Sequence, residues 1–397
     1  MPETSPAQEP TPTEHPSPTA IAALFLRLGL TAFGGPAAHI AMMQHEIVDH
    51  RKWISNEEFL DLLGASNLIP GPSSTELAIH IGFRLARWKG LLLAGICFIL
   101  PAFLLVMGIA SAYVRFGLLP HAAGILYGVK PVVIAIVLQA LWNLGRSALK
   151  SRFIAGVGAA ATLITFLNIS PLLVLFGAGT LTAGKQWITG RERGSLAPLA
   201  GLLGLIAILV TLPVMFNHGS ASTAVNRSVL FWLFLKFGSV VYGSGYVLLA
   251  FLRTDLVTRL HWLSSAQLID AIAIGQVTPG PVFTTATFIG FVLGGPMGAI
   301  FATVGMFLPA FIFVAISGRV VKGIRKSPVA GAFLDGVNAA SLALMAAVTW
   351  ELGRSAIVDV ITAGLALAGA VVLFRYRVNS LWLILGGALV GLVVLTR

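Results

Sequence analysis

Long apolar segments, separated by short polar stretches, run along nearly the whole chain after its first 18 residues. Thirteen segments can be drawn, at about 19–47, 55–86, 89–113, 119–145, 152–169, 171–187, 196–216, 228–250, 264–292, 295–318, 330–353, 357–374 and 378–396. Most of them reach the ~20 residues that a helix needs to cross a bilayer. The pattern therefore predicts an all-α polytopic membrane protein.

The second half of the chain repeats the first. An offset of 209 residues places Arg27 on Lys236 and Pro70-Gly71-Pro72 on Pro279-Gly280-Pro281, and after a one-residue gap the offset becomes 208. Internal repeats of this kind are typical of transporter folds. The sequence predicts four parts: a disordered Pro-rich cytoplasmic tail at 1–18, an N-terminal transmembrane repeat at 19–190, a linker with one transmembrane helix at 191–227, and a C-terminal repeat at 228–397.

The distribution of lysine and arginine predicts that the two repeats are inverted. When each broken segment is counted as one crossing, the two sides of the first repeat carry nine and three cationic residues, and the equivalent sides of the second carry three and eight. Because cationic loops remain in the cytoplasm, the reversal places the N-terminus inside and the C-terminus outside. Two re-entrant segments at the start of each repeat would also give inversion, so that alternative stays open.

Pro70-Gly71-Pro72 and Pro279-Gly280-Pro281 interrupt two long apolar segments. Proline stops a helix, because it lacks an N–H and clashes with the preceding turn. Polar residues flank both breaks, namely Asn67, Ser73, Thr75, Gln276 and Thr284. In lipid, such a break is tolerated only inside protein or beside a wet cavity, and the restarted helix presents a positive end to an anion. The two breaks are the predicted substrate site, and a structural kink is the alternative.

Intramembrane cations give a second set of candidates. Arg27 and Lys236 lie inside the first helix of each repeat, where they either attract an anion or extend toward the interface. Lys130 aligns with Asn338, so it has no cationic counterpart and ranks lower.

Three carboxylates are candidate coupling sites. Asp61 and Asp270 align near the breaks, as proton carriers, cation ligands or partners of Arg27 and Lys236. Glu76 aligns with Thr285 and lies one turn past the first break, where it is a lone candidate proton site.

The glycines Gly34, Gly35 and Gly243 predict either a second break in each repeat or close packing of helices through small residues. Ser55 and Ser264 are each followed three residues later by Glu58 or Gln267, which predicts capped helix starts just before the breaks.

Composition supports the membrane assignment and excludes other classes. Hydrophobic residues make up 57% of the chain and charged residues 10%, with a mean hydropathy of +0.90, whereas soluble proteins carry roughly 25% charged residues. The net charge of +11 fits cationic cytoplasmic loops, so we expect no nucleic-acid partner. A single cysteine, Cys97, excludes disulfides and cysteine metal clusters. With no P-loop, HExxH or dinucleotide motif, we expect no cofactor, no metal site and no ATPase motor.

Three runs of residues resemble the chromate ion transporter family. They are Phe33-Gly34-Gly35-Pro36-Ala37-Ala38-His39-Ile40, then Trp53-Ile54-Ser55 with Glu57-Glu58-Phe59, and then Asn67 with Ile69-Pro70-Gly71-Pro72 and Thr75. The resemblance covers nearly all of the chain after the tail, in the long two-half form. It implies secondary export of chromate across the bacterial inner membrane, chromate resistance, and essential residues mainly in the first half. The second copy departs at Ser244-Gly245 and Ala266-Gln267, which leaves open whether both breaks contact substrate.

The resulting hypothesis is an antiporter-like carrier in which a tetrahedral oxyanion binds between inverted repeats that rock around it. The coupling ion is a proton or a counter-anion, and a homodimer is a candidate assembly. Sulfate or another oxyanion is an alternative substrate, and an anion channel is an alternative mechanism. A membrane-embedded enzyme or lipid-handling protein is the rival from another class, although paired features in both halves indicate a path better than a catalytic group.

Overall fold

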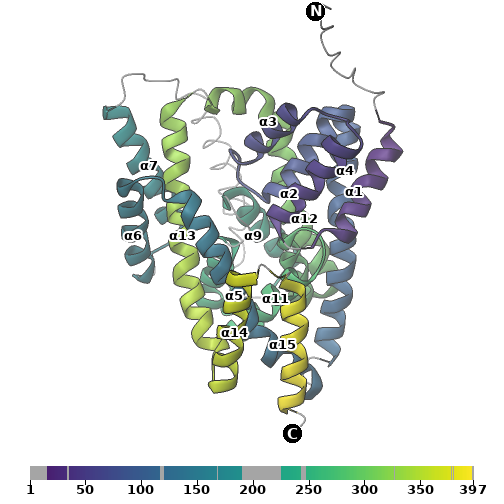
Figure 1. The fold of residues 1–397 in the computed structure, drawn as a ribbon, viewed down its shortest axis with the longest axis vertical. Coiled ribbons are helices and arrows are strands. Elements are labelled where there is room, and N and C mark those ends of the chain that lie inside the picture. The colour runs from purple at the N-terminus through teal and green to yellow at the C-terminus, as the bar shows by residue number, and fades with distance from the viewer. Residues whose placement is uncertain are drawn as a thin grey trace, which may run out of the picture.

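The computed structural model describes residues 16–33, 35–116, 120–167, 169–189, 225–242, 247–325, 327–376, 378 and 380–395 (Figure 1). Most of the predicted N-terminal tail and nearly all of the predicted joining segment at 191–227 lie outside these residues. Every regular element that is described is a helix.

The elements of the two halves follow the same order. In the first half they are α1 (Pro18–Thr31), α2 (Pro36–Gln44), the π-helical η1 (His45–His50), α3 (Asn56–Ser66), α4 (Ser73–Phe116), α5 (Pro120–Ala148), α6 (Arg152–Phe166) and α7 (Pro171–Thr189). In the second half they are α9 (Arg227–Val240), α10 (Leu248–Leu252), the π-helical η3 (Arg253–Arg259), α11 (Ser265–Val277), η4 (Val282–Thr284), α12 (Thr285–Arg325), α13 (Pro328–Ala356), α14 (Val360–Tyr376) and α15 (Ser380–Leu395). Helices α4, α5, α12 and α13 are long and apolar enough to cross a membrane.

Each half begins with a helical hairpin rather than a straight crossing. Arg27 on α1 forms an ion pair with Glu46 on η1. If the two helices continued in one line, these residues would lie about 28 Å apart, beyond the reach of their side chains. Lys236 and Asp255 form the equivalent pair in the second half at 2.7 Å, so α9 and η3 fold back in the same way.

A second hairpin follows in each half. Glu58 on α3 forms an ion pair with Arg84, which lies beyond the Pro-Gly-Pro break on α4, so the helix after the break returns alongside the helix before it. The assumption that each broken segment crosses the membrane once is therefore wrong. The contacts agree with the alternative in which two re-entrant segments open each repeat.

Both long helices after the breaks contain a sharp turn. The chain reverses at Ala86 and Arg87 within α4 and at Gly294 and Gly295 within α12, where the backbone is not helical. Gly82 then lies against the carbonyl of Gly90, so a Cβ atom at either glycine would collide with facing backbone, and Gly290 and Gly298 repeat this contact. Each half thus continues from a short returning helix into a long spanning one.

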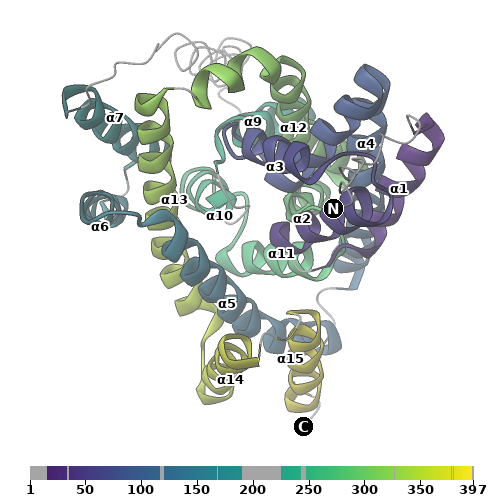
Figure 2. The same cartoon turned by 45° about the horizontal axis from the view of Figure 1, so that its top comes forward.

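The last helices of each half pack on the other half. Helices α6 and α7 pack against α13, and α14 and α15 pack against α5, as Figure 2 shows. Helix α1 lies in the upper part of Figure 1 and helix α15 in the lower part. This reciprocal packing is what two inverted copies related by a pseudo-two-fold axis produce.

The helix starts before the breaks follow from local chemistry. The Ser55 hydroxyl accepts the Glu58 N–H, and Ser264 and Gln267 form a complete capping box. After the second break the chain makes the 3₁₀ turn η4 before α12 begins, whereas α4 begins directly at Ser73. The one-residue gap in the repeat alignment lies just after this turn, between the pair Glu76 and Thr285 and the pair Ile81 and Ile289.

Candidate functional site

The two Pro-Gly-Pro breaks meet at the centre of the molecule and bind each other's half. The Gly71 N–H donates to the carbonyl of Val241 at 2.7 Å, and the Gly280 N–H donates to the carbonyl of Ala32 at 2.9 Å. Ala32 and Val241 are the residues that end α1 and α9. Because both donors and both acceptors are related by the 209-residue offset, the two bonds are one contact repeated by the pseudo-two-fold axis.

Glycine is required at these two positions. Gly71 and Gly280 have φ values of +136° and +86°, which residues with a side chain rarely adopt. A Cβ atom at Gly280 would press on Ala102 and on the Gly29 carbonyl, and one at Gly71 would collide with the Glu76 carboxylate. The breaks therefore allow the backbones of the two halves to approach one another.

The first helix of the first repeat ends in a break of its own. Gly35 has a φ of +80°, and α2 starts anew at Pro36. The predicted second break is thus confirmed at Gly35, while Gly34 and Gly243 lie outside the described residues. Each half brings the end of its first helix to the Pro-Gly-Pro break of the other half.

A cavity of about 1050 Å³ lies beside these breaks and takes its lining from both halves. We call it the amide cavity, because amide and hydroxyl side chains line it: Asn67, Ser73, Gln139, Asn143, Tyr242, Gln276, Asn338, Ser341 and Ser380. Phe33 and Pro36 from the first break add apolar wall. Arg146, Lys150 and Asp335 also line it, from the last turns of α5 and the start of α13.

The charge in the amide cavity favours an anion. Among the described residues that line it, Asp335 is the one carboxylate; Lys150 neutralises it at 2.7 Å, and Arg146 adds a further positive charge. Neutral amide and hydroxyl donors can replace the water around an oxyanion without adding negative charge. Among the described residues, no group of three or more His, Cys, Asp and Glu could hold a metal ion.

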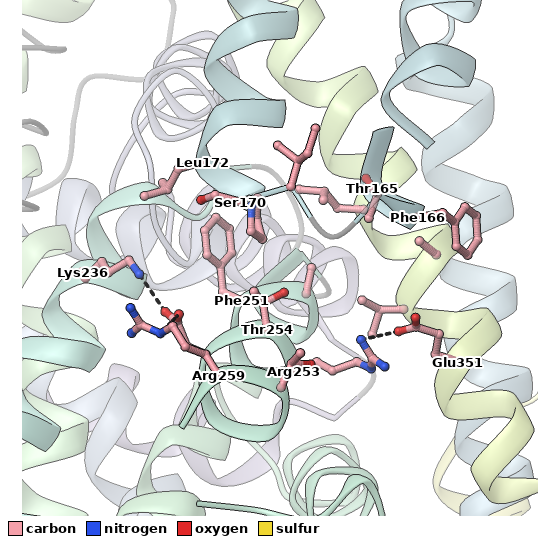
Figure 3. A pocket seen from close by; sticks show the side chains of 18 residues that line it. Thr165, Phe166, Ser170, Leu172, Lys236, Phe251, Arg253, Thr254, Arg259 and Glu351 are labelled. Carbon is pink, nitrogen blue, oxygen red and sulfur yellow. Dashed lines mark hydrogen bonds and ion pairs between the residues drawn. The ribbon is translucent and has the colours of Figure 1, made fainter. Parts of the chain in front are cut away.

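A second cavity of about 450 Å³ lies toward the opposite end of α13 (Figure 3). Its lining includes Glu351, which lies about 24 Å along α13 from Asp335 of the amide cavity. Leu344, Ala347 and Glu351 align with Ile136, Gln139 and Asn143 of the amide cavity. The two cavities are therefore partial pseudo-symmetric counterparts that lie toward opposite ends of the molecule.

Ion pairs cross the second cavity, which we call the ion-paired cavity. Lys236 binds Asp255 at 2.7 Å, Arg259 lies 3.2 Å from the same carboxylate, and Arg253 pairs with Glu351. Figure 3 shows Lys236 and Arg259 on one side of this space and the pair of Arg253 and Glu351 on the other. Asn143 of the amide cavity aligns with Glu351 of the ion-paired cavity, so at this position one space has a neutral amide and the other a charge.

The structure separates the predicted site residues into three groups. Asn67, Ser73 and Gln276 line the amide cavity, and Pro70, Gly71, Pro72, Pro279, Gly280 and Pro281 form the breaks beside it. Thr75 and Thr284 are fully buried and do not line either cavity. Arg27 and Lys236 lie in the first hairpins, each paired with a carboxylate, and neither lines the amide cavity. Their role in binding an anion remains a prediction.

Of the three roles considered for Asp270, the pairing with Lys236 is wrong. Asp270 binds Lys130 at 3.1 Å and accepts a hydrogen bond from the Tyr113 hydroxyl at 2.9 Å, whereas Lys236 binds Asp255. Lys130 has no cationic counterpart in the second repeat, which gave it a low rank as a candidate. A buried cation nevertheless needs a partner of opposite charge, even where the other repeat has no cation at that position. Glu46 was missed as the partner of Arg27, and its alignment with Asp255 is the signal that could have found it.

Comparison with known proteins supports the interpretation of both halves. A family model described as "Chromate transporter" matches residues 19–183 and 228–392, one match for each repeat. No solved structure is similar enough to match.

Curated relatives match along nearly the whole chain. A "Chromate transport protein" of Cupriavidus metallidurans is 34% identical over 380 residues, which cover 93% of this chain and 91% of the relative. A "Chromate transport protein" of Pseudomonas aeruginosa is 32% identical over 394 residues, which cover 97% of this chain and 94% of the relative. The "Uncharacterized transporter YwrB" of Bacillus subtilis is 32% identical over 163 residues, which cover 40% of this chain and 80% of that shorter protein. The chain is a multi-pass membrane protein that belongs to the chromate transporter family.

Proposed function

We propose that this chain is a secondary transporter that exports chromate from the bacterial cytoplasm, with the amide cavity as its inward-facing binding site. The observation that carries the proposal is the meeting of both Pro-Gly-Pro breaks beside a cavity lined by amides from both halves. The names of the relatives from C. metallidurans and P. aeruginosa support chromate as the substrate.

The charge distribution supports the direction in which the amide cavity opens. With two hairpins opening each repeat, twelve described lysine and arginine residues fall at the end of the molecule where α1 begins: Arg51, Lys52, Arg84, Arg87, Lys89, Arg146, Lys150, Arg152, Lys185, Arg319, Lys322 and Arg325. Five fall at the other end: Arg115, Arg227, Arg253, Arg259 and Arg354. By the positive-inside rule the N-terminal end is cytoplasmic. The Arg146 and Lys150 side of the amide cavity then faces the cytoplasm.

The two cavities support alternating access. The amide cavity is large on the proposed cytoplasmic side, and its smaller counterpart on the other side is crossed by ion pairs. Rocking the repeats about the central Gly71 and Gly280 contacts would enlarge one cavity as the other narrows. This is the motion that inverted repeats around a fixed site provide in other transporters.

The membrane voltage can drive export without ATP. Moving one charge across 100 mV is worth about 2.3 kcal/mol, so an uncompensated dianion leaving a negative interior gains about 4.6 kcal/mol. That energy corresponds to more than a thousandfold gradient, and each proton that accompanies the dianion outward would reduce the voltage-driven part by one charge. Export on this basis would give the cell chromate resistance.

The proposal is tested by chromate uptake into everted inner-membrane vesicles, with empty-vector vesicles as the control. We expect uptake that depends on the chain and on an inside-positive voltage, and that saturates with chromate concentration. Addition of sulfate in excess distinguishes a general oxyanion carrier, which sulfate inhibits, from one selective for chromate. Absence of chain-dependent uptake in energised vesicles would refute the proposal, and flux that never saturates would indicate a channel.

A further inference from the structure

A carboxylate without a partner is buried beside the first break. Glu76 has 0% of its surface exposed, and neither of its carboxyl oxygens has a hydrogen-bond partner. No described cation forms an ion pair with it. Two neighbouring groups are also without a partner, the Nε2 atom of His80 one helical turn later and the Tyr242 hydroxyl after the end of α9.

The second repeat shows that the fold does not need this carboxylate. Thr285 aligns with Glu76, and its hydroxyl donates to the carbonyl of Val282 at 2.8 Å. The Thr284 hydroxyl likewise donates to Pro281, whereas the aligned Thr75 hydroxyl has no partner. The second copy therefore builds the same break with satisfied neutral groups, and the unsatisfied cluster is peculiar to the first.

Burial decides which form of Glu76 the site accepts. An ionised carboxylate is tolerated in protein interior only with donors or a cation, and Glu76 has neither among the described residues. Glu76 therefore holds a proton in the structure as it stands. It can lose that proton only when the neighbouring segments rearrange or water reaches it.

The amide cavity reaches almost to this carboxylate. Ser73, one turn before Glu76 on α4, lines the cavity, and so does Tyr242, which lies within electrostatic reach of Glu76. A dianion in the cavity would repel an ionised Glu76 across a short, poorly solvated distance. The anion and the proton therefore favour each other's binding, and by linkage the effect is reciprocal.

We propose that Glu76 is a proton-binding site linked to the amide cavity, so that the cavity binds its oxyanion together with a proton on Glu76. This inference rests on the proposed function, because it takes the amide cavity as the anion site. One proton then enters with each anion, and the loaded carrier moves one negative charge fewer than the dianion alone.

Three other titratable groups face this region, and each has a different role. His39 on α2 is satisfied as a neutral ring, because its Nε2 donates to the Ala32 carbonyl at 3.1 Å and its Nδ1 accepts from Ser74 at 3.2 Å. Tyr242 presents a neutral hydroxyl at the cavity wall. His80, on the same helix as Glu76, is the one unpartnered group among these three that could compete for the proton, so it needs its own control.

The test is proton uptake on chromate binding, measured by calorimetry on the purified full chain in two buffers of different ionisation enthalpy. The measurement is made at alkaline pH, where chromate itself carries no proton. The pH is raised in steps, because the free protein can take up a proton on binding only where Glu76 has already lost its own. In that range we expect uptake approaching one proton per bound chromate, and an affinity that falls toward tenfold for each pH unit. Glu76→Gln mimics the protonated form, so it should bind chromate without proton uptake and with an affinity that does not change with pH.

Two further variants keep the test decisive. Glu76→Thr installs the residue that the second copy carries, and it replaces Glu76→Gln if that variant does not fold. His80→Gln removes the competing group and should leave proton uptake in place. Chromate binding with no proton uptake at any pH of the series, proton release, or uptake unchanged in Glu76→Gln would overturn the inference and leave the proposed function standing. No chromate binding by the unaltered chain would remove both.

Discussion

Asn143→Asp places one negative charge on the wall of the amide cavity with almost no change in side-chain size. Asn143 is exposed, and its aligned position in the other cavity already holds a carboxylate, Glu351. The substitution should therefore change the electrostatics without unfolding the protein. It isolates the claim that the amide cavity receives a dianion.

The size of the effect follows from the cavity volume. A sphere of about 1050 Å³ has a radius of roughly 6 Å, which is the distance from a central anion to the wall. Repulsion between a dianion and one charge at this distance is about 1.4 kcal/mol at the dielectric constant of water and about 5 kcal/mol at an effective value of 20. Since 1.4 kcal/mol is a factor of ten, we expect chromate affinity to fall at least tenfold.

The assay is chromate uptake into everted vesicles at a range of chromate concentrations, with protein amounts matched by immunoblot. Asn143→Gln keeps the amide and is the matched control, for which we expect uptake within a factor of a few of the original. The loss in Asn143→Asp should shrink at high ionic strength, because the Debye length falls to about 3 Å at 1 M salt, which is shorter than the roughly 6 Å between the two charges. Equal half-saturating concentrations for Asn143→Asp and Asn143→Gln would refute the placement of the anion.

The remaining predictions concern the central contact, the hairpins and the topology. Gly71→Ala should destabilise the protein by about 1–3 kcal/mol or more, because the backbone there has a positive φ and the new Cβ atom collides with Glu76. Gly108→Ala is the control and should be neutral or slightly stabilising, because its Cβ atom meets nothing within 4 Å. Thermal unfolding in detergent measures both. Lys236→Gln should lower the free energy of unfolding by about 1–3 kcal/mol in the same measurement, because it leaves Asp255 with Arg259 alone. A smaller decrease in the Lys236→Gln, Asp255→Asn double variant would identify the ion pair as the cause. In a Cys97→Ala background, Lys89→Cys should react with an impermeant thiol reagent from the cytoplasmic side and Met297→Cys from the opposite side, and reaction of both from one side would contradict the inversion.

The repeat alignment predicted the centre of the fold because equivalent sequences form equivalent contacts. It paired Gly71 with Gly280, and the structure makes the same reciprocal hydrogen bond from each. The direction of the chain after each break could not be predicted in this way. Proline shows where a helix stops, but an apolar helix of 14 residues that returns has the same pattern as half of a helix that continues.

Ion pairs between side chains were predictable from the sequence only where both repeats have charged residues at the aligned positions. Arg27 and Glu46 align with Lys236 and Asp255, so the two ion pairs could have been inferred together. Lys130 and Asp270 could not, because the second copy of this position is Asn338. The amide cavity was predicted in part through Asn67, Ser73 and Gln276, whereas Gln139, Asn143 and Asn338 come from α5 and α13, which carry no break or motif to single them out.

The reaction of a cysteine placed inside the amide cavity tests whether this cavity opens to the cytoplasm and binds the anion. Ser73→Cys in a Cys97→Ala background puts a thiol of nearly the same size at the first break, on the cavity wall. We expect an impermeant maleimide to reach this thiol from the cytoplasmic side, and chromate to slow the reaction in a saturable manner. Labelling from the opposite side, or a rate that saturating chromate does not change, would contradict it.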